Sequence, residues 1–315
     1  MPQKTFLRYR YSSLFLVLAT VFSSAETVCY ARVIVSNGQT EETIQVDPLS
    51  GNVLKDTNGA AVNNAGTVGS IGTAGGTGVI QDNQITADWP VSSVLQGGAV
   101  ANSGNIVAIY ADFVGNTIDS GRRYEGSGGA IYNSGGIEQI GEANLFRQFG
   151  QNAVIGNKGE GGAISNASAG VITYIYADFG NNSSVGYGGA IYNEGTITQI
   201  GQADRHSIFS VNKTSGNANN NRGGAIANDN GGRITDIYAD FQKNAAYHYG
   251  GAISNYGTSS NNSWIGSISG SFTDNTFTGR SGYGGAIANI RSTIESISGS
   301  RFIQNGAGSG ADDGR

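Results

Sequence analysis

Apolar residues recur along this chain with the spacing of extended strands. Residues 172–179 read Ile-Thr-Tyr-Ile-Tyr-Ala-Asp-Phe, and closely related runs occupy 106–113 and 234–241. Successive side chains of a β-strand point to opposite faces, so the second isoleucine, the alanine and the phenylalanine share one face. Tyr176 and Asp178 lie on the other face. We therefore expect strands with one apolar and one polar face.

These runs belong to a two-part signature, Gly-Gly-Ala-aliphatic-x-Asn followed by Phe-x-x-Asn, that recurs seven times between Gly97 and Asn305. A unit that returns every 27 to 35 residues indicates one structural coil used repeatedly. The residues that we expect to hold the coils together include Gly128, Gly129, Asn133, Phe149, Asn152, Gly188, Gly189, Asn193, Phe241 and Asn244.

The repeat predicts an all-β fold, a right-handed parallel β-helix. No repeat unit shows convincing helical periodicity, so a repeating sheet must bury its apolar face against itself, and a solenoid does this. The handedness follows from the general chirality of parallel crossovers. Asn-x-Gly steps such as Asn133-Ser-Gly135 and Asn193-Glu-Gly195 are expected to be corners that use positive φ. Seven coils give a rod roughly 30–35 Å long.

The chain divides into three parts. Residues 1–25 are typical of a signal peptide, with an alternative end at residue 31. Residues 32–66 are expected to be an N-terminal β cap or irregular first strands, with a hairpin formed by 33–35 and 43–46. Residues 67–315 are predicted to form the β-helix.

The pairing of Gly-Gly-Ala-Ile-x-Asn with Phe-x-x-Asn resembles the repeat of the polymorphic outer membrane proteins of chlamydiae and of related bacterial autotransporter passengers. The resemblance covers 97–305. It implies a surface-displayed β-helical passenger, often adhesive, that continues into an outer-membrane translocator barrel. No barrel strands are visible before Arg315, so we expect a fragment truncated at its C-terminus or a passenger without its translocator.

Composition narrows the classes of function. The net charge of −5 and the pI near 5.0 argue against nucleic acid as a partner. Cys29 is the single cysteine, so no intrachain disulfide is expected. No cofactor, metal or catalytic motif is predicted. Three aspartates, Asp112, Asp178 and Asp240, recur at every second coil, and we expect outward, solvated side chains. His206 and His248 are expected to be surface residues.

The loop that precedes each glycine pair is the variable part of the repeat, and such loops often carry recognition. Several of these loops end in aromatic or basic residues. Stacked along one edge, they would form either a strip for a glycan or protein ligand or a structural stack that closes the coil. The candidate residues are Arg122, Arg123, Tyr124, Tyr187, Arg222, Tyr249 and Tyr283.

Three classes of function remain open. The first is an exported adhesin or structural rod at the outer-membrane surface or outside the cell, with a host or neighbouring-cell protein or glycan as partner. The second is a β-helical carbohydrate-active enzyme, a lyase or glycoside hydrolase. The third is a self-associating module that pairs end to end, because an uncapped last coil exposes a sheet edge.

Overall fold

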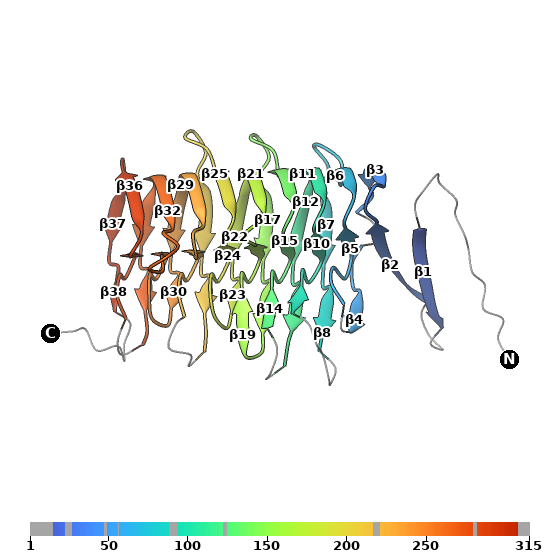
Figure 1. Ribbon diagram of the computed structural model, residues 1–315, viewed down its shortest axis with the longest axis horizontal. Coiled ribbons are helices and arrows are strands. Elements are labelled where there is room, and N and C mark those ends of the chain that lie inside the picture. The colour runs from blue at the N-terminus through green and yellow to red at the C-terminus, as the bar shows by residue number, and fades with distance from the viewer. Residues whose placement is uncertain are drawn as a thin grey trace.

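The computed structural model describes residues 15–22 and 27–307, except 47–48, 56, 88–93, 122–124, 217–220 and 280–281; of residues 15–22 and 27–31 it describes the backbone alone. The described residues form a rod of stacked β-strands without a helix (Figure 1). The chain winds through about eight turns, and each turn contributes a strand to each of several faces. The prediction of an all-β parallel solenoid is therefore confirmed.

The first face carries the Ala-aliphatic-x-Asn segments as nine parallel strands, with one antiparallel strand, β1 (Phe15–Phe22), beside the first of them. In spatial order the parallel strands are β2 (Thr27–Val35), β5 (Val62–Asn64), β10 (Val100–Asn102), β15 (Ile131–Asn133), β20 (Ile164–Asn166), β24 (Ile191–Asn193), β28 (Ile226–Asp229), β31 (Ile253–Tyr256) and β35 (Ile287–Ile290).

The second face follows the first corner, and the third face carries the phenylalanines. One strand, β29 (Arg233–Gln242), runs through both faces and joins them. The other strands of the second face are β3 (Thr40–Ile44), β6 (Thr67–Ile71), β11 (Asn105–Ile109), β16 (Gly136–Ile140), β21 (Val171–Ile175), β25 (Thr196–Ile200), β32 (Trp264–Ser269) and β36 (Thr293–Ile297). Those of the third face are β7 (Gly78–Gln81), β12 (Ala111–Val114), β17 (Arg147–Gly150), β22 (Ala177–Gly180), β26 (Ser207–Ser210), β33 (Ser271–Thr273) and β37 (Arg301–Ile303).

The fourth face closes each coil, and a short three-stranded sheet flanks it. The fourth face consists of β4 (Val53–Lys55), β8 (Gln84–Thr86), β13 (Thr117–Asp119), β18 (Ala153–Ile155), β23 (Ser183–Ser184), β27 (Lys213–Thr214), β30 (Ala245–Ala246), β34 (Thr276–Phe277) and β38 (Gly306–Ala307). The flanking sheet consists of β9 (Leu95–Gln96), β14 (Glu125–Ser127) and β19 (Lys158–Glu160).

The interior is built from rows of identical side chains. Ile175, Ala177 and Phe179 are fully buried, as the alternation predicted. The strand register pairs identical residues of neighbouring coils, for example Ile131 with Ile164, and Phe149 with Phe179. Rings of successive phenylalanines from Phe113 to Phe302 stack with centroids 4.6–5.0 Å apart. Stacked rings in contact contribute dispersion energy beyond their burial.

Two columns of buried asparagines run along the rod, one at the first corner and one after the phenylalanines. The side-chain amide of Asn152 donates to Asn182 Oδ1 at 3.0 Å and to the Phe113 carbonyl at 2.9 Å. Asn133 likewise donates to Asn166 Oδ1 at 2.8 Å. Each amide therefore links neighbouring coils, a role that the sequence analysis did not predict.

The corners do not use positive φ as predicted. Neither Asn133 nor Gly135 has a positive φ; glycine is required at 135 because a Cβ there would lie 2.0 Å from the Gly104 carbonyl oxygen of the preceding coil. Positive φ occurs instead at the first glycine of each pair, such as Gly128 at 74°. It also occurs just before the second asparagine column, as at Gln151.

The amino-terminal strands correct a second expectation. Val33–Val35 and Thr43–Val46 do not form a hairpin, because β2 pairs with β5 and β3 pairs with β6, both in parallel. Residues 33–44 thus run along the first and second faces of the earliest coil. Degenerate residues in 60–64 and 67–71 keep the same register as later coils, which extends the regular stack upstream of Gly97.

Candidate functional site

The residues directly before the glycine pairs form one continuous column, which we call the pre-glycine column. Parallel pairing links its members coil by coil. From the N-terminal end they are Gln96, Ser127, Glu160, Tyr187, Arg222, Tyr249 and Tyr283. The structure therefore brings together Tyr187, Arg222, Tyr249 and Tyr283, as the sequence predicted. Arg122, Arg123 and Tyr124 lie outside the described residues.

The C-terminal part of this column is an accessible aromatic surface. The rings of Tyr249 and Tyr283 are parallel, 7° apart in plane, with centroids separated by 5.7 Å. Tyr283 is 65% exposed, whereas Tyr249 is half-buried. A flat ring with a polar tip suits contact with a sugar or a peptide. Among the described members of the predicted strip, these two tyrosines are the ones best placed to contact a ligand.

Arg222 has a structural position instead. Its guanidinium lies over the rings of Tyr187 and Tyr256, with Cζ 4.8 Å and 3.8 Å from their centroids, and only 7% of the residue is exposed. Nη2 forms an ion pair with Asp229 Oδ2 at 3.1 Å. Because its faces and its charge are engaged within the protein, Arg222 braces three coils and is not available to an external ligand.

Glu160 of the column belongs to a cluster of carboxyl groups that also includes Glu194 and Asp229. Burial raises the pKa of Glu160 to about 7, although Ser127 donates to its Oε2 at 2.9 Å and Lys158 lies 3.7 Å from its Oε1. Burial also raises the pKa of Asp229, which Arg222 partly offsets.

Tyr192 connects this cluster. Its hydroxyl donates to Glu194 Oε1 at 2.6 Å, and burial together with the surrounding carboxylates raises the pKa of Tyr192. Sequence reasoning did not single out Glu160, Glu194 or Asp229, because they occupy different positions of the repeat and only the stacking of coils gathers them.

A second feature is the loop ridge, defined as the loops at residues 72–77, 141–146 and 201–206, which project along one edge of the rod (Figure 1). Each connects the second face to the third, at every second coil. Loops 141–146 and 201–206 each contain a tight hairpin, closed by mutual backbone bonds between Glu142 and Leu145 and between Gln202 and Arg205.

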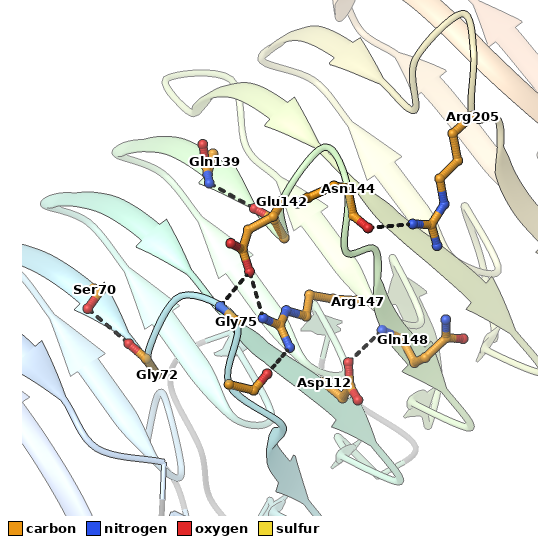
Figure 2. A network of polar contacts seen from close by, with 12 residues as sticks. Ser70, Gly72, Gly75, Asp112, Gln139, Glu142, Asn144, Arg147, Gln148 and Arg205 are labelled. Atoms are coloured by element: carbon orange, nitrogen blue, oxygen red, sulfur yellow. Dashed lines mark hydrogen bonds and ion pairs between the residues drawn. The ribbon is translucent and has the colours of Figure 1, made fainter.

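The three loops are bonded to one another across the intervening coils. Glu142 Oε2 accepts from the backbone amide of Gly75 at 2.9 Å and from Arg147 Nη2 at 3.1 Å, and Arg147 Nη1 donates to the Gly76 carbonyl at 2.6 Å (Figure 2). Farther along, Arg205 Nη1 donates to the Asn144 carbonyl at 3.1 Å. Loops tied in this way form a rigid surface.

The aspartates flanking the ridge face outward, as predicted, but they are bound and not merely solvated. Asp112 Oδ1 accepts from the backbone amide of Gln148 at 2.8 Å, and Asp178 Oδ1 accepts from that of Ile208 at 2.9 Å. Asp240 accepts in the same way from Ser271. Asp112 and Asp178 thus hold the next coil where a loop has interrupted the regular backbone ladder, whereas Asp240 makes the same bond to a coil without a loop.

The two histidines differ from each other. His206 is half-exposed in the last loop of the ridge, and its Nδ1 lies 3.5 Å from Asp240 Oδ1. His248 is 9% exposed and packs against Tyr247 and Tyr249, so its prediction as a surface residue was wrong. Burial lowers the pKa of His248.

No group of three potential metal ligands is found among the described residues. None of these residues belongs to a helix capable of crossing a membrane. Comparison of the chain with protein-family models, with curated proteins and with solved structures gives no match.

Proposed function

We propose that this chain is an exported surface passenger of the autotransporter type, working as an adhesin or structural rod whose outer features contact a host or neighbouring-cell protein or glycan. The observation that carries the proposal is the division of labour along the solenoid. The interior repeats the same residues coil after coil, whereas the pre-glycine column and the loop ridge vary from one coil to the next. A constant scaffold that displays a varied surface is typical of repeat proteins that bind ligands.

The export part of the proposal is tested by expressing the whole chain in a Gram-negative bacterium. We expect cleavage after Ala25 or Ala31, and a protein recovered outside the inner membrane. Amino-terminal sequencing and fractionation measure both. Uncleaved chain in the cytoplasm would contradict export.

The binding part is tested on a glycan array and on host-cell surfaces. We expect the double substitution Tyr249→Ala and Tyr283→Ala to abolish binding of the chain to the array and to the cells, because it removes the accessible aromatic surface. Tyr110→Ala, at a half-buried tyrosine outside the column, is the matched control. Binding that survives the double substitution would exclude the pre-glycine column as the surface that contacts the ligand.

A carbohydrate-active enzyme is the second candidate, and the buried carboxyl cluster favours it. An acid whose pKa lies near 7 is suited to proton transfer at neutral pH. Against this, Glu160 is bonded to Ser127 and Tyr192 to Glu194 within the protein. Release of reducing ends from polysaccharides, abolished by Glu160→Gln, would establish the enzyme; no release by the unchanged chain would exclude it.

Self-association is the third candidate, favoured by the apolar surface of the last described coil. Phe302 is 51% exposed and Ile297 is 45% exposed, although their counterparts in inner coils are fully buried. A hollow of about 660 Å³ lies among residues 284–305 at this end.

A further inference from the structure

Two of the three loops in the ridge accept a hydrogen bond from an arginine farther along the rod, one at the start of β17 and one in loop 201–206, and the third loop accepts none from the described residues. Arg147 donates to the carbonyl of Gly76 in loop 72–77, and Arg205 donates to the carbonyl of Asn144 in loop 141–146. We propose that the tip of loop 201–206 is a docking site for an arginine side chain on a partner protein.

The contact of Arg205 with loop 141–146 shows what such a site requires. Arg205 places its guanidinium 4.0 Å from the centroid of the Phe146 ring while donating to the Asn144 carbonyl. Gln202 adds a bond from its amide to the Ala143 carbonyl at 2.9 Å. An arginine therefore finds ring contact and one tip carbonyl together, while the other tip carbonyl accepts from a glutamine. A guanidinium suits this arrangement because it is planar and stacks on rings while it donates in its plane.

At the last loop the tip carbonyls are present and unoccupied by any described residue, and a histidine stands where the inner loop has its phenylalanine. Ala203 and Asp204 correspond to Ala143 and Asn144, and their carbonyls accept no hydrogen bond within the described part of the chain. Two coils farther on, β32 passes into β33 through Gly270 alone, so no fourth loop stands beside the third. The position that an arginine fills at the inner loop is open here.

The tip of this loop carries a carboxylate, and the guanidinium of Arg205, the neighbouring residue, is turned toward Phe146 of loop 141–146. Asp204, which is exposed, replaces the neutral Asn144, so the tip adds a carboxylate to its two carbonyls. His206 replaces Phe146, with its ring centroid 6.5 Å from that of Tyr238 and Nδ1 3.5 Å from Asp240 Oδ1. Carboxylates pair strongly with arginine, because its bonds to them are charge-assisted.

The loop is also rigid before any ligand arrives. The backbone amides of Gln202 and Arg205 donate to each other's carbonyls at 3.0 and 3.1 Å, and Gln199 Nε2 donates to the Gly201 carbonyl at 2.7 Å. A site that is already ordered loses little conformational entropy on binding. The inference rests on the proposed function only for its cellular setting, since the contact itself is measurable with the purified chain.

The first experiment titrates the isotope-labelled full chain with the peptide acetyl-Gly-Arg-Gly-amide, followed by nuclear magnetic resonance. We expect saturable shifts confined to the amides of loop 201–206. The citrulline peptide, similar in shape but uncharged, should give no saturable shifts, and the lysine peptide should bind more weakly. Asp204→Asn should weaken binding about tenfold. Asp82→Asn, at an exposed aspartate on another edge, should leave the affinity unchanged.

The second experiment uses the inner site as an internal standard. Arg205→Gln vacates the contact on Asn144 and Phe146, so a second set of saturable shifts should appear in loop 141–146. Circular dichroism confirms that this exposed substitution leaves the fold intact.

Three results would overturn the proposal: no saturable shift in loop 201–206 of the unchanged chain, equal binding of the lysine peptide, or no second site in Arg205→Gln. Shifts in the same loop that depend on protein concentration without peptide would assign the arginine to a second copy of this chain and reject a different partner. Export of the chain does not enter these measurements, so their failure is separate from failure of the proposed function.

Discussion

At the scale of single residues, identical side chains in this repeat serve the contact between coils more than the shape of one coil. Asn152 illustrates this: its backbone amide and side-chain amide both donate to Asn182 Oδ1, while its own Oδ1 accepts from Asn116. Burying an amide costs free energy unless every donor and acceptor finds a partner. The asparagine columns meet that requirement by repetition, since each residue satisfies the one before it.

Replacement of one asparagine in the column should therefore be costly. We expect Asn152→Ala to lower the free energy of unfolding by more than about 2 kcal/mol, because it removes the oxygen that accepts from both amides of Asn116 and the donor to the Phe113 carbonyl. Urea denaturation measures the change. Gln151→Gly is the matched control, since φ at Gln151 is 57° and glycine adopts it without strain. An equal loss in both variants would contradict the role of the column.

Glu160 should make stability depend on pH near neutrality. Its folded pKa of about 7 lies above the usual 4.5, so the folded chain retains the proton that the unfolded chain has lost. The stability linked to this proton is complete below pH 4.5 and is lost as pH rises through 7, amounting to about 3 kcal/mol.

The measurement compares melting temperatures between pH 5 and pH 8. Glu160→Gln should remove most of the decrease in melting temperature at higher pH, because glutamine does not ionise. Glu138→Gln, at an exposed glutamate, should show the same decrease as the unchanged chain. A decrease that persists unchanged in Glu160→Gln would place its origin elsewhere among the facing groups, which include Lys158, Glu194 and Tyr192.

At the scale of elements, each strand is short, and pairing with neighbours stabilises it. Strands such as β23 (Ser183–Ser184) have two residues and no apolar run, so no local pattern distinguishes them. The longer second and third faces were predictable because isoleucine, alanine and phenylalanine alternate there. The loop ridge was only partly visible, although Gln139-Ile-Gly-Glu-Ala and Gln199-Ile-Gly-Gln-Ala share a pattern that marks its second and third loops.

The phenylalanine stack should dominate the stability of the third face. Phe209 lies 4.6 Å from the ring centroid of Phe179 and 5.0 Å from that of Phe241. We expect Phe209→Ala to cost about 3–5 kcal/mol, because it removes a buried ring and leaves a cavity between two others. Ile208→Ala, on the same strand but 42% exposed, should change stability by about 0.5 kcal/mol or less. Chemical denaturation of both variants decides whether burial or strand propensity governs this face.

At the scale of the whole molecule, the two regular ends of the stack differ. The earliest coil has β1 beside β2 on its first face, whereas the last described coil leaves Phe302, Ile297 and Ile303 exposed. Unpaired strand edges and apolar rows of this kind readily pair with further strands.

Association through that end should depend on protein concentration. We expect sedimentation velocity to show oligomers that Phe302→Lys combined with Ile297→Lys abolishes, because the charges cannot be buried in a continued stack. Ile208→Lys places a charge on an exposed isoleucine of the third face, far from that end, and should leave the oligomers intact. A chain that stays monomeric at high concentration would exclude this mode of association.

The sequence by itself determined the repeat, the strands of its second and third faces and the inward positions of isoleucine, alanine and phenylalanine, because alternation within one strand is a local property. It also predicted that Tyr187, Arg222, Tyr249 and Tyr283 would share an edge, since each precedes a glycine pair. Only the tertiary structure decided that Arg222 is buried between two rings and that Glu160, Glu194 and Asp229 form a cluster. These outcomes depend on contacts between side chains of neighbouring coils. The residues that make those contacts lie far apart in the sequence.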